Sequence, residues 1–226
     1  MKVIICGATG MVGHGVTNAA LDDDRVTAVI AVGRRPLGRN HPKLSELILD
    51  DVAELGPHES RLRDAATCLF CLGVSSAGMD EAAYRRITYE LTLRVAETLA
   101  GLNPNMSFVY VSGAATNSES RQMWARVKGE TEQAIARLGF RATAAARPGY
   151  IQPVGGAVSR TTLYRALYAV AKPLYPLLLK LFPNAMIDSD ELGRVLLQVG
   201  LEGAGRQTLE TADLRRLADN ALPAAT

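Results

Sequence analysis

Three glycines near the start of the chain have the spacing of a ligand-binding turn. They are Gly7, Gly10 and Gly13, in the stretch GATGMVG. They lie between an apolar run, Lys2–Cys6, and a helical pattern over Met11–Leu21. Gly7 allows a tight turn, Gly10 lets a ligand approach the backbone, and Gly13 lets the helix pack close to the strand. Because free amides at a helix start attract anions, the spacing predicts a site for the diphosphate of a dinucleotide. The alternative is a strand–helix turn that binds nothing.

A pair of arginines occupies the position where a second contact with such a cofactor is expected. An NAD site carries an acidic residue about 20 positions after the glycine motif, but here the stretch VGRRP places Arg34 and Arg35. Guanidinium groups suit the 2′-phosphate of NADP, and bonds to charged groups are worth roughly 1.5–3 kcal/mol. The sequence therefore predicts NADP, with NAD less favoured and a solvated basic loop as the alternative. Asp51 and Val52 are expected near the adenine ring.

The surrounding pattern alternates short apolar strands with helices. Strands are expected at Lys2–Cys6, Val26–Val32, Leu44–Leu49, Thr67–Leu72, Ser107–Ser112, Arg141–Ala146 and Gln207–Glu210, and helices at Met11–Leu21, Asp80–Ala100, Arg121–Leu138, Ser189–Leu201 and Ala212–Ala218. Nearly continuous apolar strands are typical of a parallel sheet covered on both faces. The pattern predicts an α/β fold with a doubly wound parallel sheet, a Rossmann fold, as a single domain over residues 1–226.

After Pro148 the alternation of apolar strands and helices is interrupted. Residues 150–160 are rich in glycine, proline and serine and predict a loop, whereas residues 161–182 are apolar with three tyrosines. We expect a small C-terminal substrate region with a lid insertion over residues 150–185. An oligomer contact is an alternative, and contact of residues 161–182 with a membrane surface is less favoured. Charges and prolines within the segment argue against a membrane-spanning helix.

Composition narrows the class of protein. The 226 residues carry a net charge of +2, which predicts no strong attraction to nucleic acid or anionic membranes. Cys68 and Cys71 form a C-x-x-C, but residues three apart on a strand face opposite sides, so core cysteines are expected rather than a redox or zinc pair. An odd cysteine count and the lack of a secretory signal pattern predict a cytoplasmic protein. No metal site is expected, because the histidines are scattered, at His14, His41 and His58.

Several local stretches together resemble a known family. These are GATGMVG, Ser112 at the end of the fifth strand, Lys128 on the next helix, and ARPGY at 146–150. The chain is similar to the atypical short-chain dehydrogenases/reductases, in particular to the Tat-interacting-protein-like oxidoreductases and bacterial proteins called epimerases by analogy. CLG at 71–73, VKGETE at 127–132 and RPG at 147–149 are the best local matches. The resemblance spans nearly the whole chain and is more specific for the superfamily than for a substrate.

The resemblance implies roles for individual residues. Ser112 would orient a substrate carbonyl or hydroxyl, and Lys128 would hold the nicotinamide ribose. A hydroxyl that caps a loop and a solvated helix lysine are the respective alternatives. The other residues expected at the cofactor are Thr9, Met11, Val12, Cys71, Leu72, Gly73 and Pro148.

The chain departs from the family at the catalytic tyrosine. The position four residues before Lys128 is Trp124, which shares a helix face with the lysine and can reach the cofactor. An indole is a donor only and does not transfer protons, whereas a placed acid–base group contributes about 10²–10⁴-fold. Tyr150, an ordered water or Lys128 itself could supply the proton, and Tyr89 is a more remote candidate. Alternatively, Trp124 only packs over the pocket.

The expected function is therefore an NADP-dependent oxidoreductase acting on a small carbonyl or alcohol, with the substrate left unspecified. An NADPH-binding regulatory or scaffold protein with little catalysis is the alternative, because of Trp124. A sugar-nucleotide epimerase is a weaker alternative, since that chemistry also needs the tyrosine. A homodimer through the helices at 80–100 and 121–138 is a further expectation that the resemblance suggests.

Overall fold

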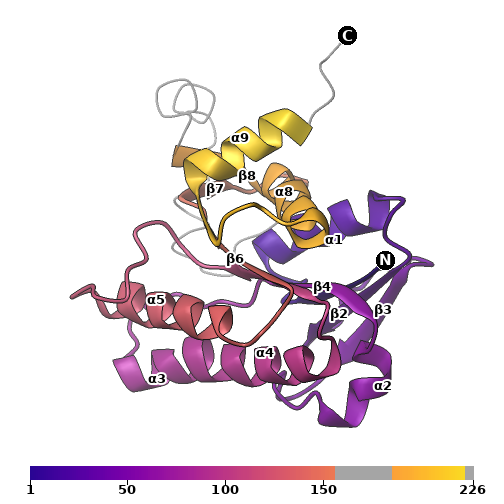
Figure 1. Ribbon diagram of the computed structural model, residues 1–226, viewed down its shortest axis with the longest axis horizontal. Helices are drawn as coiled ribbons and strands as arrows, with labels where there is room; N and C mark the ends of the chain where they lie inside the picture. The colour runs from indigo at the N-terminus through magenta and orange to yellow at the C-terminus, as the bar shows by residue number, and fades with distance from the viewer. Residues whose placement is uncertain (156–184, 222–226) are drawn as a thin grey trace.

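A seven-stranded parallel sheet forms the centre of the protein, in a computed structural model that describes residues 1–155 and 185–221. Its strand order is β3-β2-β1-β4-β5-β6-β9, and each neighbouring pair is parallel (Figure 1). The strands are β1 (Lys2–Cys6), β2 (Ala28–Gly33), β3 (Leu44–Ile48), β4 (Ala65–Phe70), β5 (Ser107–Val111), β6 (Ala142–Arg147) and β9 (Thr208–Glu210). The predicted doubly wound parallel sheet is confirmed.

Helices cover both faces of this sheet. One layer holds α1 (Met11–Asp22), α8 (Ser189–Glu202) and α9 (Thr211–Ala221), and the other holds α3 (Glu81–Arg85), α4 (Leu91–Leu102) and α5 (Met123–Ala136) (Figure 1). A π-helical segment, Arg86–Glu90, joins α3 to α4. A 3₁₀ turn, Gly56–His58, leads into the short α2 (Glu59–Leu62).

Each face of the sheet carries its own core. Val3 and Ile5 of β1 belong to the cluster under α1 and α8, whereas Ile4 and Cys6 belong to the cluster under α4. Successive side chains of a strand point to opposite faces, so both faces of β1 are buried and its sequence is apolar throughout. Cys68, fully buried on β4, lies in the second cluster as expected of a core cysteine.

Two glycines let α1 and α8 cross at very short range. A Cβ on Gly15 would lie 2.1 Å from the carbonyl oxygen of Ser189, and one on Gly193 would lie 2.3 Å from the carbonyl carbon of Gly15. The start of α8 is fixed by a capping box, in which Asp188 accepts from two helix amides and Glu191 accepts from the Asp188 amide. The crossing packs α1, which begins at the glycine turn, directly against α8.

One part of the predicted architecture is wrong. Residues 150–152, expected in a loop, form the strand β7 (Tyr150–Gln152), which pairs in parallel with β8 (Met186–Asp188) as a second, two-stranded sheet. Such short strands carry no periodic signal and exist because of a pairing that is distant in sequence. The predicted apolar segment 161–182, and with it most of the expected lid, lies outside the described residues. Within the described chain, no helix is both long and apolar enough to span a bilayer.

Candidate functional site

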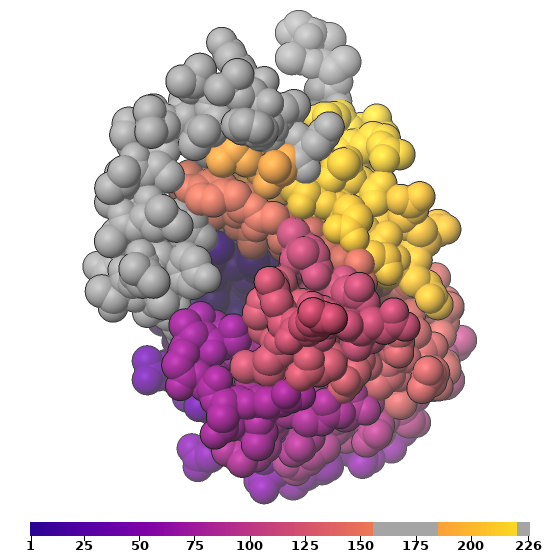
Figure 2. Space-filling view, turned by 90° about the vertical axis from the view of Figure 1, so that its left-hand side faces the viewer, coloured from indigo at the N-terminus to yellow at the C-terminus, as the bar shows by residue number. Residues whose placement is uncertain are grey.

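The start of α1 and the carboxyl ends of β4 and β5 enclose a cavity of about 260 Å³. Its described lining is Gly10, Met11, Val12, Cys71, Leu72, Gly73, Val74, Val111, Ser112 and Lys128. In Figure 2 the N-terminal residues, in indigo, form the floor of a hollow. Apart from two valines, every residue in this lining was predicted from the sequence to lie at the cofactor or in the catalytic group. The fold thus brings together residues that are more than a hundred positions apart.

The glycine turn has the geometry that its spacing predicts. Gly7 adopts a φ of +85°, and a Cβ there would lie 2.9 Å from the amide nitrogen of Leu72. A Cβ on Gly13 would lie 2.1 Å from the Gly7 carbonyl oxygen, so only glycine allows the helix to start this close to β1. Gly10 is the N-cap, and α1 has neither a side-chain cap nor an acidic residue in its first turn. The positive end of the helix dipole therefore has no anionic side chain near it in the first turn.

Ser112 follows β5 directly and takes part in a short hydroxyl chain. Its amide donates to the Ala146 carbonyl at 2.7 Å, and its Oγ lies 3.1 Å from Thr116 Oγ1. Thr116 in turn donates its single hydroxyl proton to the Gly113 carbonyl at 2.7 Å. Ser112 is therefore the donor in its bond with Thr116, and its lone pairs are left for a donor on a ligand. The structure places Ser112 in the cavity and also as a partner of the loop hydroxyl.

Lys128 reaches the cavity from α5 rather than extending into solvent. Its Nζ donates to the Val111 carbonyl at 3.3 Å and lies 5.3 Å from the centre of the Tyr110 ring. Burial lowers the pKa of Lys128 to about 8, against the opposing attraction of Glu132. The ammonium is thus an acid whose pKa lies close to neutral pH.

Trp124 lies one helical turn before Lys128, at the position of the missing tyrosine. The Cζ3 atom of its indole would be 3.9 Å from a Cβ placed on Gly113, so the ring packs beside the turn that follows Ser112. Trp124 is not among the described residues that line the cavity, and its role at the cofactor stays a prediction. An indole in this place can hydrogen-bond as a donor but cannot exchange a proton.

The two alternative tyrosines are placed elsewhere. Tyr150 donates its hydroxyl to Gln152 Oε1 at 2.9 Å on β7, and it is not among the described residues that line the cavity. Burial raises the pKa of Tyr150, which makes it a weaker acid. The guanidinium of Arg85 lies 4.3 Å from the ring centre of Tyr89, on the π-helical segment. Among the described lining residues, Lys128 is the one with a proton to exchange near neutral pH.

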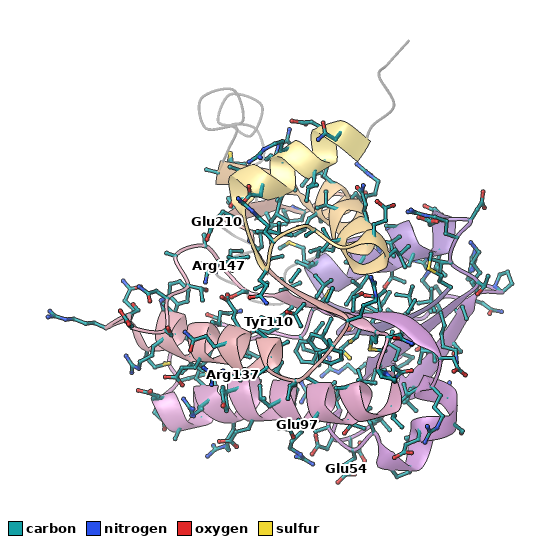
Figure 3. All side chains as sticks on the ribbon, in the orientation of Figure 1. Glu54, Glu97, Tyr110, Arg137, Arg147 and Glu210 are labelled. Atoms are coloured by element: carbon teal, nitrogen blue, oxygen red, sulfur yellow. The ribbon has the colours of Figure 1, made fainter. Side chains whose placement is uncertain are left out.

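Pro148 lies next to a three-way ion pair at the end of β6. Its carbonyl accepts from the Ala114 amide at 3.1 Å, which ties it to the loop after Ser112. Arg147 binds Glu132 of α5 at 2.6 Å and Glu210 of β9 at 2.9 Å (Figure 3). These contacts fix the chain on one side of the site. Pro148 itself is not among the described residues that line the cavity.

The loop between β2 and β3, residues 34–43, carries the two predicted arginines and is called the arginine loop below. Arg34 and Arg35 are exposed and have no hydrogen-bond or ion-pair partner within the described chain. Arg35 and Thr9 line one small pocket, together with Glu46 of β3. Thr9 belongs to the glycine turn, so the arginine loop lies beside it.

The residues expected near adenine have other contacts. Asp51 accepts from the Ala53 amide at 2.9 Å through Oδ1, and its Oδ2 lies 3.3 Å from Arg94. Val52 is buried in the core under α4. Their role at an adenine ring stays a prediction.

The sequence did not predict roles for Thr116 or for Val74 and Val111, two of the three valines that line the cavity. Thr116 lies in an irregular loop with no periodic pattern, and its bond to Ser112 depends on the fold of that loop. In residues 1–155 and 185–221, no three histidine, cysteine or carboxylate side chains gather as metal ligands would.

Comparison with known protein sequences gives distant relatives of fungal origin. No family model matches the chain. It is 27% identical over 157 residues to "Protein fmp52, mitochondrial" of Aspergillus fumigatus, a match that covers 66% of each chain. It is 24% identical over 245 residues to "Protein FMP52, mitochondrial" of Saccharomyces cerevisiae, covering 97% of this chain and 96% of the relative. The match to the Aspergillus protein spans about two thirds of its length.

Solved structures share the fold. MoeE5, solved with UDP-glucuronic acid and NAD, superposes with a TM-score of 0.67 at 17% identity, covering 92% of this chain and 74% of that one. The UDP-N-acetylglucosamine 4-epimerase of Bacillus cereus gives 0.64 at 14% identity, covering 92% and 76%. A short-chain dehydrogenase family protein of Francisella tularensis gives 0.63 at 14% identity, covering 89% and 91%. The chain thus has the fold of NAD-binding proteins of the short-chain dehydrogenase type.

These comparisons also correct one expectation. The cytoplasmic location predicted from the cysteines and the N-terminal sequence is wrong, because the relatives are named as mitochondrial proteins. Reduced cysteines indicate a reducing environment and do not distinguish one compartment of that kind from another. The likeness to the Tat-interacting-protein-like subgroup is not singled out by any of these proteins and stays a prediction.

Proposed function

We propose that the protein is an NADP-dependent oxidoreductase of the atypical short-chain dehydrogenase type, acting on a small carbonyl or alcohol. The observation that carries this proposal is the shared cavity, in which the start of α1 meets Ser112 and Lys128. A diphosphate beside Gly10 would accept hydrogen bonds from the first amides of α1. The nicotinamide end would then extend toward Ser112, as in the family that the sequence resembles.

The preference for NADP over NAD rests on the arginine loop. Arg35 lies beside the glycine turn, and neither Arg34 nor Arg35 has a partner in the described chain, although each guanidinium is a strong donor. A 2′-phosphate supplies the anion that this pair lacks. Several solved neighbours were crystallised with NAD, which is a property of those proteins.

The proton in the reaction is assigned to Lys128. NADPH held at the start of α1 would supply the hydride that reduces the carbonyl carbon of the substrate. The oxygen then takes a proton from the Lys128 ammonium, which becomes a neutral amine and is protonated again from solvent. Ser112, whose own proton goes to Thr116, accepts a hydrogen bond from the hydroxyl of the alcohol form of the substrate and so orients that oxygen beside the lysine. This assignment replaces Tyr150, whose hydroxyl is bonded to Gln152 on the second sheet.

Binding measurements test the cofactor assignment without knowledge of the substrate. Titration calorimetry should show NADPH binding about tenfold or more tighter than NADH, and the double variant Arg34→Ala/Arg35→Ala should remove the difference. Arg137→Ala, at the end of α5, is the matched control for loss of an exposed arginine. Equal affinities in the wild type would exclude the NADP preference, and no binding of either dinucleotide would exclude the function.

Trp124 supports a second candidate, a protein that binds NADPH for regulation or as a scaffold and turns over slowly. The indole fills the place of the family's proton donor and packs beside the loop after Ser112. NADPH oxidation with a panel of small aldehydes and ketones separates the two candidates. Tight NADPH binding with no oxidation above the protein-free rate would favour the regulatory protein.

A further inference from the structure

The arginine loop is held to the rest of the fold by hydrogen bonds that leave Arg34 and Arg35 unused. Arg39 donates to Asn18 Oδ1 of α1 at 2.6 Å. Lys43 donates to the carbonyls of Leu21 and Asp23, at 3.0 and 2.9 Å. Two of the four arginine and lysine side chains of the loop therefore anchor it.

The third anchor comes from a carboxylate. Glu46 projects from β3, and its Oε2 accepts a hydrogen bond from the amide of Leu37 at 3.0 Å. Leu37 follows the two arginines by only two residues, so this bond is the anchor nearest to them in sequence. It ties the loop to the strand next to β2.

In the described chain, Glu46 forms a hydrogen bond with the Leu37 amide and no ion pair with Arg35. Glu46 and Arg35 line the same small pocket, beside Thr9. Although a carboxylate and a guanidinium form strong hydrogen bonds, no ion pair joins Glu46 to Arg35 in the described chain, and Glu46 bonds a main-chain amide instead. The carboxylate thus shapes the loop without neutralising the arginine.

Resting on the proposed NADP site, we infer that Glu46 is a positioning residue for cofactor preference. By holding the Leu37 amide, it keeps Arg35 beside the glycine turn and Arg34 next to it in the chain, where the two would recognise the 2′-phosphate of NADPH. Without this bond the loop has more conformations, and part of the binding free energy is lost in ordering it. NADH has no 2′-phosphate, so its affinity depends much less on this loop.

Two substitutions at one position separate the hydrogen bond from the charge. Glu46→Ala removes the acceptor and should weaken NADPH binding about five- to tenfold, while NADH affinity stays within about twofold. Glu46→Gln keeps an acceptor oxygen, so its NADPH affinity should equal or exceed that of the wild type, because removal of a negative charge cannot weaken binding of a phosphate. Calorimetric titration of each variant with NADPH and NADH measures both ratios.

Glu97→Ala is the matched control, since Glu97 is an exposed carboxylate on α4, on the opposite face of the sheet from α1 (Figure 3). It should change neither affinity. As a second readout, hydrogen exchange at the Leu37 amide should be slow in the wild type and Glu46→Gln and fast in Glu46→Ala. This measurement needs no ligand.

The outcomes distinguish this inference from the proposed function. A wild type that binds no dinucleotide, or binds both equally, overturns the NADP site and this inference with it. A wild-type preference for NADPH that Glu46→Ala leaves intact overturns the inference alone. So does a Glu46→Gln variant that loses the preference as fully as Glu46→Ala.

Discussion

Ser112 and Thr116 are joined by a hydrogen bond of 3.1 Å between their hydroxyl oxygens, at the carboxyl end of β5. The proton of Thr116 goes to the Gly113 carbonyl, so the direction of the bond is fixed and Ser112 donates to Thr116. Ser112 lines the cavity, whereas Thr116 lines a groove of about 610 Å³ beside α5. The pair therefore fixes the orientation of Ser112, the hydroxyl-bearing side chain among the described residues that line the cavity.

Removal of the Thr116 hydroxyl should lower turnover without affecting the cofactor. Thr116→Val keeps the side-chain shape but frees the Ser112 hydroxyl to rotate away from the orientation in which it accepts from a substrate hydroxyl. Loss of this hydrogen bond predicts about a five- to tenfold drop in kcat for alcohol oxidation. The dissociation constant of NADPH should stay within about twofold, and Thr116→Ser should restore the rate. Equal rates for Thr116→Val and the wild type would mean that Ser112 needs no such support.

The acidity of Lys128 predicts a particular pH profile. With its pKa lowered to about 8 by burial, the ammonium is present below that pH and is lost above it. Carbonyl reduction should therefore be constant at lower pH and fall as the pH rises through about 8, whereas alcohol oxidation should rise. Initial rates of NADPH oxidation between pH 6 and about 10 would show the profile. A wild-type profile without a transition near this value would assign the proton to another group.

The same pKa has a consequence for stability. Lys128 binds a proton less readily in the folded protein than in the unfolded chain, whose lysine pKa is 10.5. Between about pH 8 and 10.5 the unfolded state binds more protons, so this residue makes stability rise with pH in that window. Lys128→Met should lack the contribution, which denaturant unfolding at several pH values would measure. Identical pH slopes for the two proteins would contradict the burial of the ammonium.

Substitution of Trp124 by tyrosine is predicted to raise turnover, whereas removal of the Thr116 hydroxyl is predicted to lower it. Trp124→Tyr places a phenol one helical turn from Lys128, where the ammonium can lower the pKa of the hydroxyl. If the missing acid limits turnover, carbonyl reduction should increase by at least about tenfold, within the range that a placed acid–base group contributes. Trp124→Phe, which adds no hydroxyl, is the control. A rate for Trp124→Tyr no higher than that of Trp124→Phe would show that Lys128 or water already supplies the proton.

The sequence predicts the structural features that depend on local or periodic patterns better than those that depend on contacts between residues distant in the chain. The glycine turn and the seven strands of the main sheet are local or periodic features, and their predicted bounds agree to within about two residues of those observed. The strand β7 was missed because it exists only through pairing with β8, 34 residues later. Thr116 and Glu46 were missed for a related reason, since each acts through one hydrogen bond to a loop whose path no pattern reveals. Lys128 was identified by spacing, but its lowered pKa follows from burial that the fold creates.

The close packing at the glycine turn predicts a sharp contrast between two glycine-to-alanine substitutions. Gly13→Ala would place a Cβ 2.1 Å from the Gly7 carbonyl oxygen, where main chain rather than a flexible side chain must move. Overpacking of this kind typically costs about 1–3 kcal/mol or more, and the shift of α1 should also weaken NADPH binding. Gly101→Ala, late in α4, meets no atom within 4 Å and should stabilise the helix by roughly 0.5–1 kcal/mol. Chemical denaturation of the two variants beside the wild type measures both effects, and a Gly13→Ala protein as stable as Gly101→Ala would show that α1 does not start as close to β1 as described.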